Sequence, residues 1–178
     1  MTLELERIIS SLARTPPVLD ALLRDLPEPW RNEGPHTWSA FDVVGHLVHG
    51  ERTDWMQRAR MVLQFGQTRP FEPFDRMGFV RDSQGKSLAL LLDEFARLRS
   101  ENLDDLRALD LQPEDLDRRG RHPALGEVTL SQLLATWAAH DLTHLHQISR
   151  ILAHQYRDAV GPWAQYLGVL QCVGHSSP

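Results

Sequence analysis

Cysteine is nearly absent from this chain, since Cys172 is the only one among 178 residues. A single cysteine cannot form an intramolecular disulfide framework or a cluster of thiolate metal ligands. Apolar runs are short as well, and none approaches the roughly 20 residues that a membrane-spanning helix needs. The N-terminus carries acidic residues where a signal peptide would carry basic ones. We therefore expect a cytoplasmic protein with no membrane association.

A basic surface is missing too. The chain has 19 lysine and arginine residues against 24 acidic residues, a formal net charge of −5, and the basic residues are spread along its length. Proteins that bind nucleic acids neutralise phosphates with clustered basic side chains. The acidic balance therefore argues against a nucleic-acid partner.

Strand patterns are scarce, whereas apolar residues recur at helical spacing throughout. The helical patterns cover Leu3–Leu12, Val18–Leu26, Ala40–Phe65, Ser87–Leu109, Leu130–His154 and Trp163–Leu170, with a short turn at Pro113–Leu116. Thr15, Ser39 and Thr129 are predicted N-caps, and Asp42 completes a capping box with Ser39. The length suits one hydrophobic core. We predict a single all-α domain over residues 1–178, with helices long enough for a four-helix bundle.

Two longer loops interrupt these helices. The segment 67–86 contains three phenylalanines, which either pin the loop to the core or contact a ligand. Its basic residues between Arg69 and Arg81 either meet an acidic group of a ligand or are solvated. The segment 118–128 is predicted as a second loop.

Histidine is abundant, with nine in the chain. Six of them lie in loops, near helix ends or off the clearest apolar stripes, and we expect these to be exposed: His36, His49, His122, His146, His154 and His175. Two others, in the stretch HDLTHLH, differ because His140 and His144 lie on the apolar stripe of the helix 130–154. Their four-residue spacing puts both imidazoles on one helix face. This pair predicts either a metal site or a hydrogen-bonded pair in the core.

The stretch also resembles H-E-x-x-H, the zinc-protease helix. That site needs a glutamate base next to the first histidine and a third protein ligand further along the chain. Asp141 takes the place of the glutamate, and Gln147 and Arg150 stand where the longer motif has glycine and histidine. No glutamate follows Glu127. A protease site is therefore disfavoured, and a third ligand would have to come from upstream. His46 lies near a second apolar stripe of its helix, one turn before Gly50, which only suggests it as that ligand.

Three segments of the chain resemble the DinB-like superfamily of metalloenzymes, also called DinB/YfiT-like. They are WSAFDVVGHLVHGERTDWMQRARMVL, HPALGEVTLSQLLATWAAHDLTHLHQISRIL and YRDAVGPWAQYLGVL, and their order and spacing match from about residue 5 to 170. The resemblance implies an up-down four-helix bundle with one longer crossover. It also implies a metal site of three histidines, here His46, His140 and His144. The implied cofactor is a divalent metal ion, zinc or nickel first and manganese or iron as alternatives.

The resemblance implies chemistry as well. Some members conjugate a low-molecular-weight thiol to electrophiles, and others isomerise thiol adducts. We therefore expect a metal-dependent thiol S-transferase or related enzyme that acts on a small molecule, and a homodimer. The alternative is a non-catalytic metal-binding or stress-response module. His49 and Asp141 are candidates for supporting the metal ligands from behind; Asp141 either orients a ligand histidine or is solvated.

Overall fold

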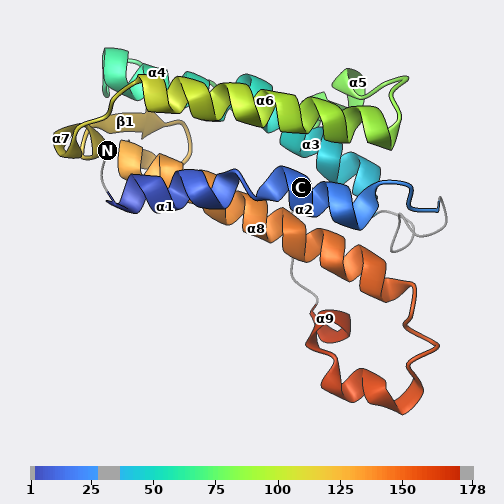
Figure 1. Ribbon diagram of the computed structural model, residues 1–178. Coiled ribbons are helices and arrows are strands. Elements are labelled where there is room, and N and C mark those ends of the chain that lie inside the picture. The colour runs from blue at the N-terminus through green and yellow to red at the C-terminus, as the bar shows by residue number, and fades with distance from the viewer. Residues whose placement is uncertain (1–2, 28–36, 173–178) are drawn as a thin grey trace.

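Long helices form the body of the protein, and the computed structural model describes residues 3–27 and 37–172 (Figure 1). The long elements are α1 (Leu3–Leu12), α2 (Thr15–Leu23), α3 (Ala40–Thr53), α4 (Trp55–Phe65), α6 (Leu88–Ala108) and α8 (Leu130–His154). The short ones are α5 (Gly78–Asp82), α7 (Pro113–Leu116), β1 (Arg119–His122), β2 (Gly126–Thr129), the 3₁₀ helix η2 (Gly161–Tyr166) and α9 (Gly168–Gln171). With α1–α2 and α3–α4 each forming one interrupted rod, four rods pack together. The predicted four-helix bundle is confirmed.

The helices α1, α3, α6 and α8 begin within one residue of the predicted positions. The Ser39 hydroxyl accepts a hydrogen bond from the amide of Asp42 at 3.2 Å, and the Asp42 carboxylate accepts one from the amide of Ser39 at 2.8 Å. Thr129 and Gln132 form the same reciprocal box at the start of α8. These caps satisfy amides that have no partner within a helix. Thr15 is different, since it is the first residue of α2 rather than its cap, and its hydroxyl points into the core.

The predicted helix 40–65 is interrupted at Asp54, which ends α3 and precedes α4. The Thr53 hydroxyl donates a hydrogen bond to the carbonyl of His49 at 2.8 Å. At Asp54 the backbone departs from regular helix geometry, with φ −119° and ψ −75°. The bend turns the Asp54 side chain inward, where it pairs with Arg58.

A two-stranded hairpin, β1 and β2, stands where a loop was predicted. Its strands are four residues each, too short to show an alternating pattern. Gly126 has a φ of +77°, a conformation that glycine adopts without strain. At Gly120 a Cβ atom would lie 2.7 Å from the Val62 side chain, so this glycine lets β1 lie directly on α4.

The apolar core consists of two clusters along the bundle. One includes Leu12, Trp55, Leu103 and Trp137, and the other includes Leu19, Val48, Phe95 and Ile148. Between them, all four rods contribute buried polar side chains: Thr15, His46 and Glu51, Arg99, and Asp141 with His144. A polar layer therefore crosses the middle of the bundle.

Within residues 3–27 and 37–172, no helix combines the length and the apolar character that crossing a membrane requires. Among the tryptophans, Trp55 is buried and Trp163 is exposed. Trp30 lies outside the described residues.

Candidate metal site

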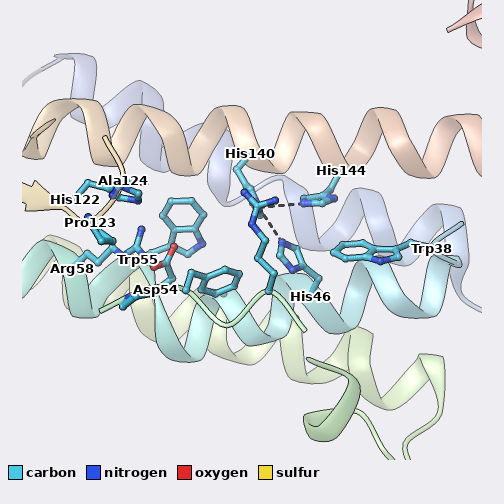
Figure 2. Close-up of a pocket in the computed structure, with 14 residues that line it drawn as sticks. Trp38, His46, Asp54, Trp55, Arg58, His122, Pro123, Ala124, His140 and His144 are labelled. Carbon is cyan, nitrogen blue, oxygen red and sulfur yellow. Dashed lines mark hydrogen bonds and ion pairs between the residues drawn. The ribbon is translucent and has the colours of Figure 1, made fainter. Parts of the chain in front are cut away.

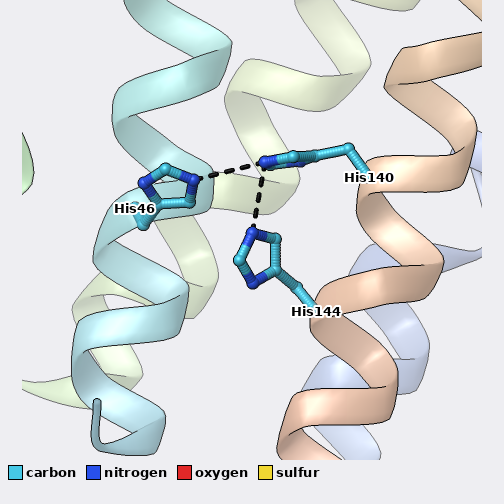
Figure 3. Close-up of side chains that lie close together, drawn as sticks. All are labelled: His46, His140 and His144. Carbon is cyan, nitrogen blue, oxygen red and sulfur yellow. Dashed lines mark hydrogen bonds between the residues drawn. The ribbon is translucent and has the colours of Figure 1, made fainter. Parts of the chain in front are cut away.

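Three histidines meet in the polar layer (Figure 3). His46 comes from α3, and His140 and His144 come from successive turns of α8. The Nε2 atom of His140 lies 3.2 Å from that of His46 and 3.1 Å from that of His144. Tetrahedral coordination with Zn–N bonds of about 2.05 Å places neighbouring ligand nitrogens about 3.3 Å apart. The observed spacing fits a divalent ion between the rings.

Hydrogen bonding between the rings cannot account for the whole arrangement. A neutral imidazole nitrogen either donates one hydrogen or offers one lone pair. The Nε2 of His140 can therefore make only one conventional hydrogen bond, although it faces two neighbours. The Nδ1 of His144 lies 2.9 Å from the Oε1 of Gln147, an acceptor, so its proton is on Nδ1 and its Nε2 presents a lone pair to the centre. A cation would satisfy all three nitrogens together.

The site keeps two of its imidazoles neutral. Burial, with the charges of His144, His49 and Arg76, lowers the pKa of His46 to about 3. Burial, with the charges of His144, His46, Arg99 and Arg76, lowers the pKa of His140 to about 2. Neutral imidazole is the form that binds a metal, so these rings are ready as ligands at neutral pH.

The ring planes are held chiefly by aromatic packing. Trp38 stacks parallel to His144, with centroids 6.3 Å apart, and Trp55 meets His140 edge-on at 5.1 Å. Gln147 is the one polar side chain described that orients a ligand ring. In the sequence, Gln147 stands out only as a mismatch to the protease motif. Its position three residues after His144, on the same helix face, was the available signal.

Asp141 does not orient a ligand histidine through a hydrogen bond, and it is not solvated. Its carboxylate is buried and accepts hydrogen bonds from the Thr15 hydroxyl at 2.5 Å and from Arg99 at 2.6 and 3.0 Å. Arg99 also binds Glu51 at 2.8 Å. Glu51 accepts further bonds from Trp137 and Asn102. These residues link α2, α3, α6 and α8 directly behind the histidines.

His49 is buried, contrary to the expectation that it is exposed. Its Nδ1 lies 2.8 Å from the carboxylate of Asp82, which ties α3 to α5. A Cβ atom at Gly78 would lie 2.4 Å from the His49 ring, so that glycine makes room for it. His49 is not among the side chains whose ligand atoms converge, and its charge helps to lower the pKa of His46.

A cavity of about 410 Å³ opens beside the three histidines (Figure 2). Its walls include Trp38, Trp55, Pro73 and Phe74, and its polar groups are Asp54, Arg58, Arg76 and His122. The segment 67–86, predicted as a loop, contains the short helix α5. Phe71 and Phe79 are buried and pin the segment to the core, and Phe74 lines the cavity. In Figure 2 Arg58 and His122 lie beyond Trp55 from the histidines, so the cavity has two distinct ends.

The remaining histidines vary. His146 is exposed as expected, His154 is half-buried, and His122 is half-buried on the cavity wall rather than exposed. His36 and His175 lie outside the described residues. Arg52, one turn after His49 on α3, forms an ion pair with Glu94 and so ties α3 to α6.

Fold and site together define a helical-bundle protein with a three-histidine candidate metal centre. The chain belongs to the DinB superfamily, which matches residues 11–148. Among solved structures it is similar to YfiT from Bacillus subtilis, described as a probable metal-dependent hydrolase with an unusual four-helix bundle topology. The similarity has a TM-score of 0.74 at 19% identity and covers 87% of this chain and 90% of YfiT. At that identity the likeness concerns the fold. No curated protein matches the sequence.

Proposed function

We propose that this protein is a divalent-metal-dependent enzyme that transfers a low-molecular-weight thiol to a small electrophile. The convergence of three Nε2 atoms at the base of a cavity carries the proposal. His46, His140 and His144 would hold the ion, with zinc or nickel preferred by three neutral imidazoles and manganese or iron as alternatives. When bound, such an ion lowers the pKa of a coordinated thiol or water and so supplies a nucleophile near neutral pH.

The chain's own residues would prepare this nucleophile. Gln147 fixes the His144 tautomer, and the polar layer behind α8 holds the helix that carries two of the ligands. Trp38, Trp55 and Phe74 line the cavity and would offer flat apolar surfaces to a substrate. Low polarity around a charged nucleophile strengthens every electrostatic interaction there.

Hydrolysis is a second candidate, favoured by the similarity to YfiT and its description as a probable metal-dependent hydrolase. Water activation at a metal is helped by a nearby general base. Among the described residues that line the cavity, Asp54 is the only carboxylate, and it already pairs with Arg58 at 2.6 Å. A coordinated thiol loses its proton without such a base. This difference supports thiol transfer over hydrolysis.

Metal analysis of the purified protein tests whether the three histidines bind a metal ion. We expect about one zinc or nickel ion per chain in the wild type and none in a His144→Ala variant. A His146→Ala variant, changed at an exposed position of the same helix, is the matched control and should keep its metal. Equal and negligible metal in all three proteins would refute the site.

Incubation of the metal-loaded protein with a panel of thiols and an alkyl halide tests the reaction. Transfer forms a carbon–sulfur bond and releases halide, which mass spectrometry and a halide assay both detect. Ester and amide substrates in parallel test hydrolysis. Metal binding without turnover of any substrate would favour the non-catalytic module instead. The expected homodimer and the thiol itself stay predictions, the former open to sedimentation measurements.

A further inference from the structure

The metal site leaves one end of the cavity without a role. There, Asp54 and Arg58 form a nearly buried ion pair, with side chains 10% and 12% exposed and a distance of 2.6 Å between Oδ1 and Nε. His122 joins them from the tip of the hairpin. We propose, on the basis of the proposed function, that this end binds a carboxylate, so that the substrate is an acidic thiol held between Arg58 and the three histidines.

Arg58 retains the donors that such a ligand needs. Its Nε is used by Asp54, and one Nη2 hydrogen makes a long 3.4 Å bond to the carbonyl of Glu72. A guanidinium has five N–H groups in a planar fork, which matches a carboxylate with two parallel hydrogen bonds. Among the described residues no further polar contact to its Nη atoms is present, so this edge remains for a ligand.

His122 adds a donor of defined orientation. Its Nδ1 accepts hydrogen bonds from the backbone amides of Ala124 and Leu125 at 3.2 and 3.1 Å. The ring proton therefore lies on Nε2, which can donate to a ligand. The buried ring of Phe71 supports both groups, with the Arg58 guanidinium 5.2 Å above its centre and the His122 ring edge-on at 6.3 Å.

Charge around the cavity favours an anion. Two guanidinium groups, Arg58 and Arg76, line it against one carboxylate, Asp54. Arg76 acts near the metal end, where its charge helps to lower the pKa values of His46 and His140. An acidic group at this end would be attracted to the Arg58 guanidinium, whereas an ammonium group would be repelled by it.

The aromatic walls set the shape of that molecule. In Figure 2 Trp55 lies between His140 and the Arg58–His122 end. A ligand that reaches both ends must cross this apolar surface. We therefore expect an extended thiol with an apolar middle and a terminal acid group.

The test uses protein loaded with cobalt(II). Coordination of a thiolate to this ion produces a charge-transfer absorption band, whose growth during titration measures thiol binding. The probes are straight-chain mercaptoalkanoates with two to six methylene groups, the matching amides, and the matching amines. For the chain length that spans the cavity, the acid should bind at least about tenfold more tightly than the amide of the same length, because it gains a charge-assisted hydrogen bond. Amines should bind more weakly than amides.

Two variants with opposite expected effects on acid binding sharpen the test. Arg58→Gln should abolish the preference for the acid over the amide. Asp54→Asn removes the competing carboxylate and should raise the affinity for the acid several-fold. This variant therefore tests the proposal even if Arg58→Gln does not fold. Arg60→Gln is the matched control, because Arg60 lies on the same helix and pairs with Asp105 at the exposed surface. It should behave as the wild type.

The outcomes separate this inference from the proposed function. Equal binding of acid and amide, a preference for amines, or weaker acid binding in Asp54→Asn would overturn the carboxylate site. A pair that serves only as a strut would lower thermal stability in both variants and leave the acid preference unchanged, which also overturns it. Absence of cobalt uptake, or of a thiolate band with every probe, would instead refute the metal-dependent thiol chemistry.

Discussion

Replacing Arg99 with methionine is the sharpest test of the polar layer. The guanidinium is 1% exposed and binds two carboxylates that are themselves 1% and 3% exposed, those of Glu51 and Asp141. It also donates a hydrogen bond to the carbonyl of Leu12 at 2.8 Å. Methionine keeps the apolar stem of arginine but supplies no charge and no donor. Both carboxylates would then be buried without their cation.

The expected cost follows from this geometry. Removing one partner of a buried ion pair costs about 3–5 kcal/mol, because the remaining charge stays out of water. Whole domains of this kind are stable by only about 5–15 kcal/mol. We therefore expect Arg99→Met to lose a large part of the free energy of unfolding. Glu51→Gln should cost less in the Arg99→Met background than in the wild type, since the two groups interact directly.

Urea denaturation at pH 7, followed by circular dichroism, measures these changes. Arg97→Met is the matched control, two residues away on the same helix, where an exposed arginine pairs only with Glu101 among the described residues. Exposed pairs of that kind contribute about 0–1 kcal/mol. A loss below about 1 kcal/mol for Arg99→Met would show that the carboxylates are not held as buried charges, and the reasoning would fail.

Three further predictions concern the site and its surroundings. Gln147→Leu should keep the fold but weaken metal affinity about 10- to 100-fold, which calorimetric titration measures. The pKa values of His46 and His140 lie below the ordinary 6.5. The unfolded chain therefore binds more protons below that pH, and the melting temperature of metal-free protein should fall as the pH drops from about 6.5 towards 3; a rise would contradict the burial of neutral rings. Gly78→Ala should cost about 1–3 kcal/mol in urea denaturation, because its methyl group would overlap the His49 ring.

Helix positions followed from local patterns. Apolar spacing and the caps at Ser39 and Thr129 act within a few residues, so they could be predicted directly. The bend at Asp54 and the hairpin at 119–129 could not. The bend involves a side chain that turns into the cavity, and the hairpin lies on α4 through a contact between residues far apart in the chain. Long-range contacts of this kind leave little trace in local sequence.

The histidines divide in the same way. Placement of His140 and His144 on one apolar stripe followed from their four-residue step, and the third histidine came from family resemblance rather than spacing. The partner of His49 is 33 positions away, and the donors to His122 belong to a turn that was not predicted as such. Burial of these two rings therefore could not be foreseen.

Sequence alone determined the all-α class, the starts of α1, α3, α6 and α8, and the two-histidine face of α8, because these depend on neighbours three or four residues apart. The meeting of His46 with this face was implied by family resemblance, and only the tertiary structure displays it. Tertiary structure alone decided that Asp141 binds Arg99 instead of a histidine, and that Arg58 and His122 share one cavity. Each of these depends on how four rods pack against one another. Packing brings together side chains whose separation along the chain carries no periodic signal, and that is the physical reason for the division.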